Sequence, residues 1–416
     1  MIIFCSVFLI IAGCTKSKKD YEYGRIDLES AFKQPDYYRL SEVAEDIEYV
    51  FLETNDSCLV ADIYSVVYDP PYYFITDRFE TSIFIFDETG KYVHTISARG
   101  QGPQEYTKID HYSVYNNVLY ILDEDQRKIL KYEVNGQCTG VFHINEYASG
   151  IKALNEDEIL TVTLNCYLIT FEDDVIPEIF DSSVKYKREG FIFTEYDRDF
   201  NLKRKFKYMK HTGSKHNDGI FSFYKHRDEL VYWEYNIYDT VYTILPDGSS
   251  EARFIYDPGD IPSTLELRTD QNYGEWLSGH FELGSLKETD DYVFIFGIYN
   301  RYVALVLYNK KDNTTRGVTE SLMNDIDGGI SFWPGFKVSD NKFGTSLFPD
   351  KIKKYMARET ADLKSGKDFY DAYRPDLDYD VAKHQKLLEQ LEKTNDMSNP
   401  VLMIVTMKSS LMEERK

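Results

Sequence analysis

Arginine, amide and aromatic side chains gather in short segments that join predicted β-strands. One of them, residues Ser97–Tyr106, reads Ser-Ala-Arg-Gly-Gln-Gly-Pro-Gln-Glu-Tyr. Planar guanidinium and amide groups hydrogen-bond to polar ligands and aromatic rings stack on them, so this chemistry suits a sugar or a peptide. The alternative is that these are ordinary exposed turn residues. The candidate ligand-binding residues are Arg78, Arg99, Gln101, Glu105, Tyr106, Arg127, Tyr235, Tyr299 and Arg301, with Gln126, Asn236 and Asn300 beside them.

The sequence shows no specific catalytic pattern. It contains neither a Gly-x-Ser-x-Gly nucleophile segment nor a His-Glu-x-x-His zinc motif. Gly100 and Gly102 resemble the start of a phosphate-binding loop, but no helix is predicted after them and no Lys-Ser or Lys-Thr pair completes the motif. We therefore expect no nucleotide site, no catalytic residue and no cofactor.

Three histidines and an acidic pair carry metal-ligating groups, but their spacing does not favour a metal site. His211, His216 and His226 fit no standard ligand spacing, so a solvated loop is the preferred interpretation. Asp123 and Asp125 lack the ring of oxygen ligands that a calcium-binding loop supplies. We interpret them as turn residues and predict no metal site.

The candidate segments are positioned by a repeated unit of alternating apolar strands and polar turns. Gly90 and Gly136 occupy the corresponding hairpin turn of two successive copies and lie 46 residues apart, a spacing typical of β-propeller blades. Asn135-Gly136 is also a strong hairpin turn. The high content of tyrosine and phenylalanine, 35 and 26 residues, favours strands as well. The expected strands of these two copies are Tyr72–Asp77, Ile83–Phe86 and Tyr92–Ile96, then Val118–Leu122, Ile129–Val134 and Thr139–Ile144.

The rest of the chain supplies four looser copies, which together predict an all-β, six-bladed β-propeller. From Ile47 to Lys408 the six copies average about 60 residues each, enough to hold insertions such as the acidic segment Glu172–Asp181. The expected strands of the later copies are Ile159–Leu164, Phe191–Tyr208, Glu229–Glu234, Thr240–Leu245, Ala252–Tyr256, Tyr292–Phe296, Tyr302–Tyr308, Ile330–Val338, Lys342–Leu347 and Val401–Met407.

The last copy is completed from both ends of the chain. A strand at Ile47–Leu52 is expected to pair with Val401–Met407 and close the ring, because a closed ring exposes no long sheet edge. Two short helices are predicted to interrupt this copy near the C-terminus, at Lys351–Glu359 and Val381–Lys393. We expect the second helix to pack over the propeller. Its shared apolar face consists of Val381, Leu387, Leu388 and Leu391.

The connectivity of a propeller blade makes a prediction about the candidate residues. In a four-stranded meander, the loops between blades and the loops joining second to third strands emerge on the same face. The nine candidate residues belong to such loops or adjoin them, so we expect them to surround the mouth of the central channel. A ring of loops around a channel forms a concave site suited to ligand binding.

The first residues predict export and lipid attachment. Residues 1–11 are almost wholly apolar and run into Ile11-Ala12-Gly13-Cys14, a lipobox pattern in which small residues precede a cysteine. An apolar run of this length is too short to span a bilayer about 30 Å thick. An ordinary signal peptide or a buried strand is the alternative. We expect a signal peptide over 1–13, lipidated Cys14 and a tether over 14–40, and the propeller over 41–416.

The net charge and the cysteine count limit which partners, disulfides and metal sites are expected. A formal net charge of −22 repels phosphate backbones, so we expect no nucleic-acid partner. Once Cys5 leaves with the signal and Cys14 carries lipid, three cysteines remain without a Cys-x-x-Cys spacing. This argues against a disulfide framework or a zinc site.

Segment Gly100–Tyr106 resembles the Gly-x-Gly-Pro-x-Glu-Tyr/Phe linker of the six-bladed β-propeller lipoproteins of Bacteroidetes, which are related to NHL-repeat propellers. Ile47–Glu53 is similar to the first strand of that family, and Asn399–Ile404 is similar to its last. Gln104 stands where the family has glycine. The resemblance implies a fold and an extracytoplasmic compartment, and it implies no reaction.

These observations favour a membrane-anchored binding or scaffolding lipoprotein. We expect it in the outer membrane, facing the periplasm or the cell surface, with a glycan, a peptide or an envelope protein as ligand and the membrane as a partner through the lipid anchor. The alternative is a propeller enzyme, a lyase or hydrolase acting on a polar extracytoplasmic substrate. An enzyme should cluster titratable groups of shifted pKa in one pocket, whereas a binding protein should present aromatic and amide groups.

Overall fold

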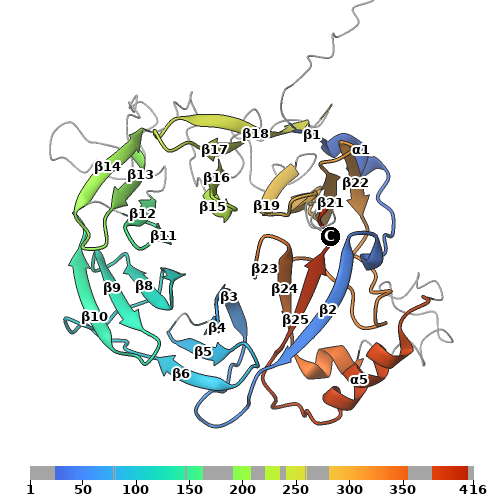
Figure 1. Cartoon of the computed structure of the whole chain (residues 1–416), viewed down its shortest axis with the longest axis horizontal. Helices are drawn as coiled ribbons and strands as arrows, with labels where there is room; N and C mark the ends of the chain where they lie inside the picture. Colours follow the sequence, from blue (N-terminus) through green and yellow to red (C-terminus); the bar gives the residue numbers. More distant parts are fainter. Residues whose placement is uncertain are drawn as a thin grey trace, which may run out of the picture.

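The computed structural model describes residues 24–77, 79, 81–145, 148–162, 191–207, 221–234, 240–257, 259, 281–354 and 377–410. Within these ranges six sheets surround a common centre as the blades of a β-propeller (Figure 1). First strands such as β3, β11, β15, β19 and β23 lie nearest that centre, and last strands such as β6, β10 and β14 lie at the rim (Figure 1). The predicted all-β, six-bladed architecture is confirmed.

The blades follow one another along the chain, and blades 1, 2, 3 and 5 are four-stranded antiparallel sheets with their strands in sequential order. Blade 1 contains β3 (Ile63–Asp69), β4 (Tyr72–Asp77), β5 (Ile83–Asp87) and β6 (Tyr92–Ile96). Blade 2 contains β7 (His111–Tyr115), β8 (Val118–Asp123), β9 (Lys128–Glu133) and β10 (Cys138–His143). Blade 3 contains β11 (Gly150–Asn155), β12 (Glu158–Val162), β13 (Phe191–Tyr196) and β14 (Leu202–Lys207).

The second half of the ring has the same plan. Blade 4 contains β15 (Phe221–His226), β16 (Glu229–Glu234), β17 (Thr240–Ile244) and β18 (Ser250–Asp257). Blade 5 contains β19 (Phe281–Glu288), β20 (Tyr292–Tyr299), β21 (Tyr302–Asn309) and β22 (Thr314–Val318). Blade 6 contains β23 (Phe336–Lys337), β24 (Lys342–Leu347), β25 (Val401–Met407) and, from the other end of the chain, β2 (Ala44–Phe51).

Two segments differ in detail from their sequence predictions. The range Phe191–Tyr208 contains the two strands β13 and β14, because the Asp197 carboxylate accepts backbone N–H bonds from Asp199 and Asn201 and fixes a turn between them. The range Ile330–Val338 contributes the two-residue strand β23, because its first part packs its apolar side chains into the core. The hairpin glycines Gly90 and Gly136 have φ values of +85° and +82°, as the predicted turns require.

Strands from the two ends of the chain share blade 6. β2 pairs antiparallel with β25, in a register that sets Ile47 opposite Val405 and Phe51 opposite Val401. β25 also pairs with β24, so it lies between two strands. The expected pairing of these two segments is therefore present. Its consequence, that this pairing holds the ring closed, stays a prediction.

The fold begins earlier than the predicted boundary at residue 41. β1 (Gly24–Asp27) runs parallel to β18 and adds a fifth strand to blade 4, and α1 (Leu28–Lys33) follows directly. Ile26, Leu28 and Ala31 are buried in the core between blades 4 and 5. The tether predicted over 14–40 is thus wrong for residues 24–40, because their apolar side chains dock on the propeller.

The helix α5 (Val381–Leu391) forms where the sequence predicts it. Its first backbone N–H groups are capped by the Asp380 carboxylate. Leu387 and Leu391 are buried in the core of blade 6, whereas Val381 is 73% exposed and lies outside the apolar face assigned to it. In the region of the other predicted helix, residues 349–354 are helical and residues 355–359 lie outside the described ranges.

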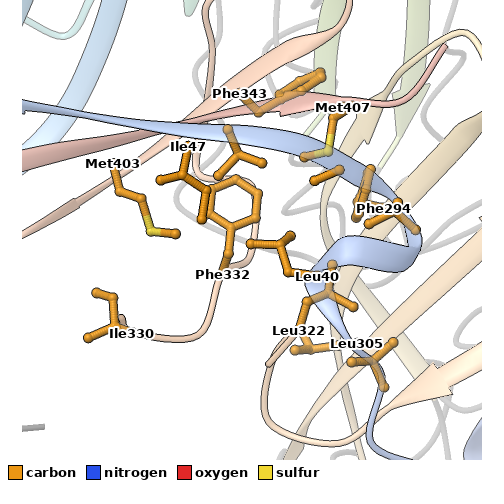
Figure 2. Close-up of a cluster of buried hydrophobic side chains, with 14 of the residues drawn as sticks. Leu40, Ile47, Phe294, Leu305, Leu322, Ile330, Phe332, Phe343, Met403 and Met407 are labelled. Carbon is orange, nitrogen blue, oxygen red and sulfur yellow. The ribbon is translucent and has the colours of Figure 1, made fainter. Parts of the chain in front are cut away.

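The largest described core joins blades 5 and 6 to the segment before β2. Leu40, in a short 3-10 helix (Leu40–Glu42), packs near Phe332 and Leu322, while Ile47 and Met403 approach from the paired strands β2 and β25 (Figure 2). Burying such side chains contributes roughly 1.5–3 kcal/mol each. This core therefore ties the N-terminal segment and the C-terminal strand to the same part of the ring.

Candidate ligand-binding site

Tyr106, the last residue of the predicted ligand-binding segment Ser97–Tyr106, has a structural role. Tyr106 has 0% exposed surface. Its hydroxyl donates to the Thr81 carbonyl at 2.9 Å and accepts from the Ala98 backbone N–H at 3.2 Å. Burial raises the Tyr106 pKa to about 12, so the hydroxyl stays protonated. The assignment of Tyr106 as a ligand-binding residue is therefore corrected: its side chain anchors the loop between blades 1 and 2.

The remainder of this segment is folded on itself and docked on blade 2. The Glu105 carboxylate accepts from the Gly102 backbone N–H at 2.8 Å, and a Cβ at Gly100 would collide with that carboxylate. Three groups from blade 2 bind carbonyls of the segment: Lys128 Nζ donates to Gly102 at 3.2 Å, Tyr132 OH to Gln104 at 2.6 Å, and Gln126 Nε2 to Gly100 at 3.5 Å. The linker motif thus joins two blades.

We predict that Tyr106→Phe destabilises the protein by about 1–2 kcal/mol, since it leaves the partly buried Thr81 carbonyl without its donor. Arg99→Ala is the matched control in the same segment, because Arg99 is exposed, and it should change stability by less than about 0.5 kcal/mol. Urea unfolding monitored by circular dichroism measures both. Equal stability of Tyr106→Phe and the wild type would contradict the structural role.

The other predicted residues are distributed over several blades. Arg99, Gln101 and Glu105 are exposed on the blade 1 to blade 2 linker, and Arg127 is exposed in the turn between β8 and β9. The contact between Gln126 and Gly100 places these two loops side by side. Arg301 is exposed in the turn between β20 and β21 on blade 5, so its convergence with the other arginines stays a prediction. Three further predicted residues, Arg78, Tyr235 and Asn236, lie outside the described residues.

Tyr299 and Asp123 have structural partners. The Tyr299 ring stacks on Phe32 of α1, with centroids 4.5 Å apart and planes 12° from parallel. Tyr299 therefore helps to dock the N-terminal helix rather than presenting a free aromatic face.

Asp123 is fully buried and accepts from the Thr107 backbone N–H at 2.7 Å and from the Thr107 hydroxyl at 2.9 Å. Of the three histidines, His226 is described and ends β15, whereas His211 and His216 lie outside the described residues.

A group of charged side chains that sequence reasoning missed lies on the innermost strands. It consists of Lys152 on β11, Lys225 on β15, Lys337 on β23 and Asp69 at the end of β3, and we call it the axial lysine cluster. These four strands belong to blades 3, 4, 6 and 1 and lie around the centre of the ring (Figure 1). All four side chains are partly buried.

A direct contact across the centre joins two members of this cluster. The Lys337 ammonium donates to the backbone carbonyl of Lys225 at 2.7 Å, which connects blade 6 to blade 4 without passing through blade 5. The same ammonium forms an ion pair with Asp340 at 2.6 Å. Asp340 also accepts the Arg227 backbone N–H at 3.1 Å. Lys337 is therefore held in place by its own partners.

Lys152 differs from its neighbours because its ammonium has no hydrogen-bond or ion-pair partner in the part of the chain that the structure describes. Burial lowers the Lys152 pKa, and the like charges of Lys337 and Lys225 lower it further, while Asp69 opposes them. Burial raises the Asp69 pKa, against a hydrogen bond at 2.6 Å from the Asn117 backbone N–H. Lys152 is therefore the member of this cluster that has no hydrogen-bonded or ion-paired partner among the described residues.

A second charged group joins blades 4 and 5. The Glu288 side chain is completely buried and accepts from both Arg253 Nε and Nη2 at 2.8–3.1 Å, from Lys310 at 2.5 Å and from Tyr224 OH at 2.5 Å. Desolvation would raise its pKa, but Lys310 and Arg253 outweigh it and hold the Glu288 pKa at about 2. The Glu288 oxygens are occupied by donors of the protein itself, so this charged group stabilises the contact between blades 4 and 5.

His226 lies beside that network. Its side chain is 4% exposed, and burial lowers its pKa, so the ring is neutral at physiological pH. Nε2 is 3.7 Å from an Asp290 oxygen and Nδ1 is 3.9 Å from an Asp340 oxygen, both beyond hydrogen-bond distance. Within the described ranges, no three metal-ligating side chains are placed to hold an ion.

A family model described as "Domain of unknown function (DUF4934)" matches residues 23–406. The chain belongs to this family. The match begins just before β1 of the DUF4934 propeller and ends within its last strand β25, so the family unit spans all six blades. No curated protein matches the chain significantly. Among the described residues, no helix has the length and hydropathy needed to cross a bilayer.

Solved structures resemble this DUF4934 propeller in fold. A protein from Bacteroides fragilis NCTC 9343 that is described as exported has 18% identity and a TM-score of 0.62, and the alignment covers 93% of this chain and 100% of that one. A member of the duf4221 family from Bacteroides vulgatus has 9% identity and a TM-score of 0.45, over 88% and 97% of the two chains. Virginiamycin B lyase from Staphylococcus aureus has 11% identity and a TM-score of 0.38, over 72% and 84%. At these identities the likeness concerns fold.

Proposed function

We propose that this DUF4934 protein is an extracytoplasmic binding lipoprotein whose propeller recognises a polar ligand, such as a glycan, a peptide or an envelope protein, at the centre of one face. The observation that carries this proposal is the convergence of charged side chains from blades 1, 3, 4 and 6 at the ring centre, with Lys152 lacking a protein partner among the described residues. Loops and strand ends around a propeller centre form a concave surface suited to a ligand.

Binding is favoured over catalysis by how the titratable groups are used. The buried carboxylate Glu288 is held ionised by three donors, and Asp123 is held by the Thr107 backbone and hydroxyl. A general acid or base needs a pKa near the working pH and a free position facing the substrate. Glu288 has neither property, and the Asp123 oxygens are occupied by Thr107, so neither acid is placed to act as a general acid or base.

The compartment proposal rests on the N-terminal pattern and on one structural likeness. The lipobox at Ile11–Cys14 supports export with a lipid anchor, and the Bacteroides fragilis protein of the same fold is described as exported. We place the protein in the outer membrane, facing the periplasm or the cell surface. The signal peptide over residues 1–13 is part of this proposal.

The binding role is tested by screening the full chain, purified in non-ionic detergent, against an array of glycans, peptides and envelope extracts. We expect saturable binding of one chemical class without turnover. Conversion of a bound compound into product would contradict the binding assignment and favour the enzyme alternative.

We predict that Cys14→Ala releases the protein from membranes, because the variant cannot accept the diacylglyceryl group that anchors it. Cys5→Ala is the matched control, since it changes a cysteine of the same apolar segment and should leave anchoring intact. Membrane fractionation and intact-mass analysis measure the outcome. An unmodified Cys14 in the membrane-extracted wild type would contradict the lipoprotein assignment.

A further inference from the structure

We infer that the axial lysine cluster binds an acidic sugar, with a carboxylate of the ligand on the Lys152 ammonium. This inference rests on the proposed binding function and names its ligand class. It follows from which charges at the ring centre are already paired and which are not.

The first step concerns the cations. Lys337 is committed to the Lys225 carbonyl and to Asp340, and the Lys225 ammonium lies 3.6 Å from Asp228. Lys152 has no such partner among the described residues. A buried or half-buried cation is costly unless an anion accompanies it. A ligand oxyanion placed at Lys152 would supply the missing charge.

The second step concerns the acceptor. One Asp69 oxygen accepts the Asn117 backbone N–H at 2.6 Å, and this carboxylate also lies in the electrostatic environment of Lys152. A ligand that approaches both groups needs a carboxylate for the lysine and hydroxyl donors for the aspartate. A sugar acid carries a carboxylate and several hydroxyl donors on one ring, whereas sulfate carries no hydroxyl donor for Asp69.

The third step concerns selectivity. The chain has a formal net charge of −22, so its average field repels anions. Lys152, whose ammonium has no ion-pair partner among the described residues, is a local exception to that average. The lowered Lys152 pKa agrees with this, since burial and like charge both disfavour the ammonium until an anion arrives. An acidic ligand would be held at this centre rather than over the acidic surface.

The test uses the full chain in detergent and isothermal titration calorimetry with three probes of equal length: trigalacturonate, the neutral sugar maltotriose and triglutamate. Trigalacturonate should bind the wild type, and Lys152→Met should weaken it at least tenfold. Lys152→Arg should keep most of the affinity. Lys386→Met, which removes the same charge from an exposed position of α5, should match the wild type.

Each other outcome overturns the inference. If Lys152→Met binds trigalacturonate as the wild type does, the site assignment is wrong. If maltotriose or triglutamate binds and trigalacturonate does not, the ligand class is wrong while the binding function stands. If an array member binds and none of the three probes does, the inference again falls and the binding function stands. If neither the probes nor the array bind, both fall.

A second measurement keeps the inference testable should Lys152→Met fail to fold. Acetylation of wild-type lysines, followed by mass spectrometry, should show Lys152 protected by trigalacturonate and Lys386 unprotected. Equal modification of Lys152 with and without the probe would overturn the inference.

Discussion

Replacing Glu288 with alanine is expected to destabilise the folded protein by about 3–5 kcal/mol, because it leaves the partly buried charges of Arg253 and Lys310 without their shared buried partner. Glu229→Ala is the matched control. Glu229 also pairs with Arg253, at 2.7 Å, but its side chain is 52% exposed. Its loss should cost at most about 1 kcal/mol. Chemical denaturation at pH 7 measures both variants.

The same carboxylate predicts an acid-sensitive part of the stability. The Glu288 pKa is about 2 in the folded protein and 4.5 in an unperturbed side chain. As the pH falls, the unfolded state therefore takes up this proton at a higher pH than the folded state does. The associated stability is complete above pH 4.5 and is lost as the pH falls from 4.5 to 2. A shift of this size corresponds to about 3 kcal/mol. An unchanged pH profile in Glu288→Ala would contradict this account of the blade 4 and 5 interface.

Val405→Pro is expected to destabilise the whole ring by at least about 3 kcal/mol. Val405 is fully buried in β25, between β2 and β24, and proline both removes a ladder hydrogen bond and disturbs the packing. If the β2 and β25 pairing closes the ring, its loss should lower the stability of distant blades as well. Hydrogen exchange of β8 and β12 should therefore accelerate together with that of β25.

Val141→Pro provides the comparison for ring closure. This variant introduces proline in β10, the outer strand of blade 2, which has one neighbouring strand instead of two. The expected loss is smaller and confined to that blade. If Val405→Pro likewise affects blade 6 alone, with β8 and β12 protected as in the wild type, the closing role of the pairing is wrong.

The repeat could be predicted from the sequence because each blade obeys local rules. Alternation marks the strands, and Gly90 and Gly136 mark hairpins that need positive φ. Residues 24–40 could not be assigned in this way, because β1 pairs with β18, which begins more than 200 residues later, and carries no hairpin or alternation of its own. The docking of Ile26 and Leu28 depends on that distant sheet.

The site was harder to predict than the fold, for the same physical reason. Tyr106 belongs to a conspicuous motif. Its structural role, however, comes from the hydrogen bond that its hydroxyl donates to the Thr81 carbonyl, and the sequence does not reveal that contact. Lys152 and Lys337 are 185 residues apart and look like ordinary strand lysines in the sequence. Their association follows from the register of the inner strands and from the circular order of the blades. A lysine between apolar neighbours in an inner strand, as Lys152 is between Ile151 and Ala153, was the available signal.

The most direct test of ligand binding at the ring centre is hydrogen exchange of the full chain with and without a ligand identified in the array. The account predicts slower exchange at the inner strands β3, β11, β15 and β23, where the axial lysine cluster lies. Protection confined to the linker 97–106 and the turn 124–127, with the inner strands unchanged, would contradict it and return the site to the exposed arginines Arg99 and Arg127.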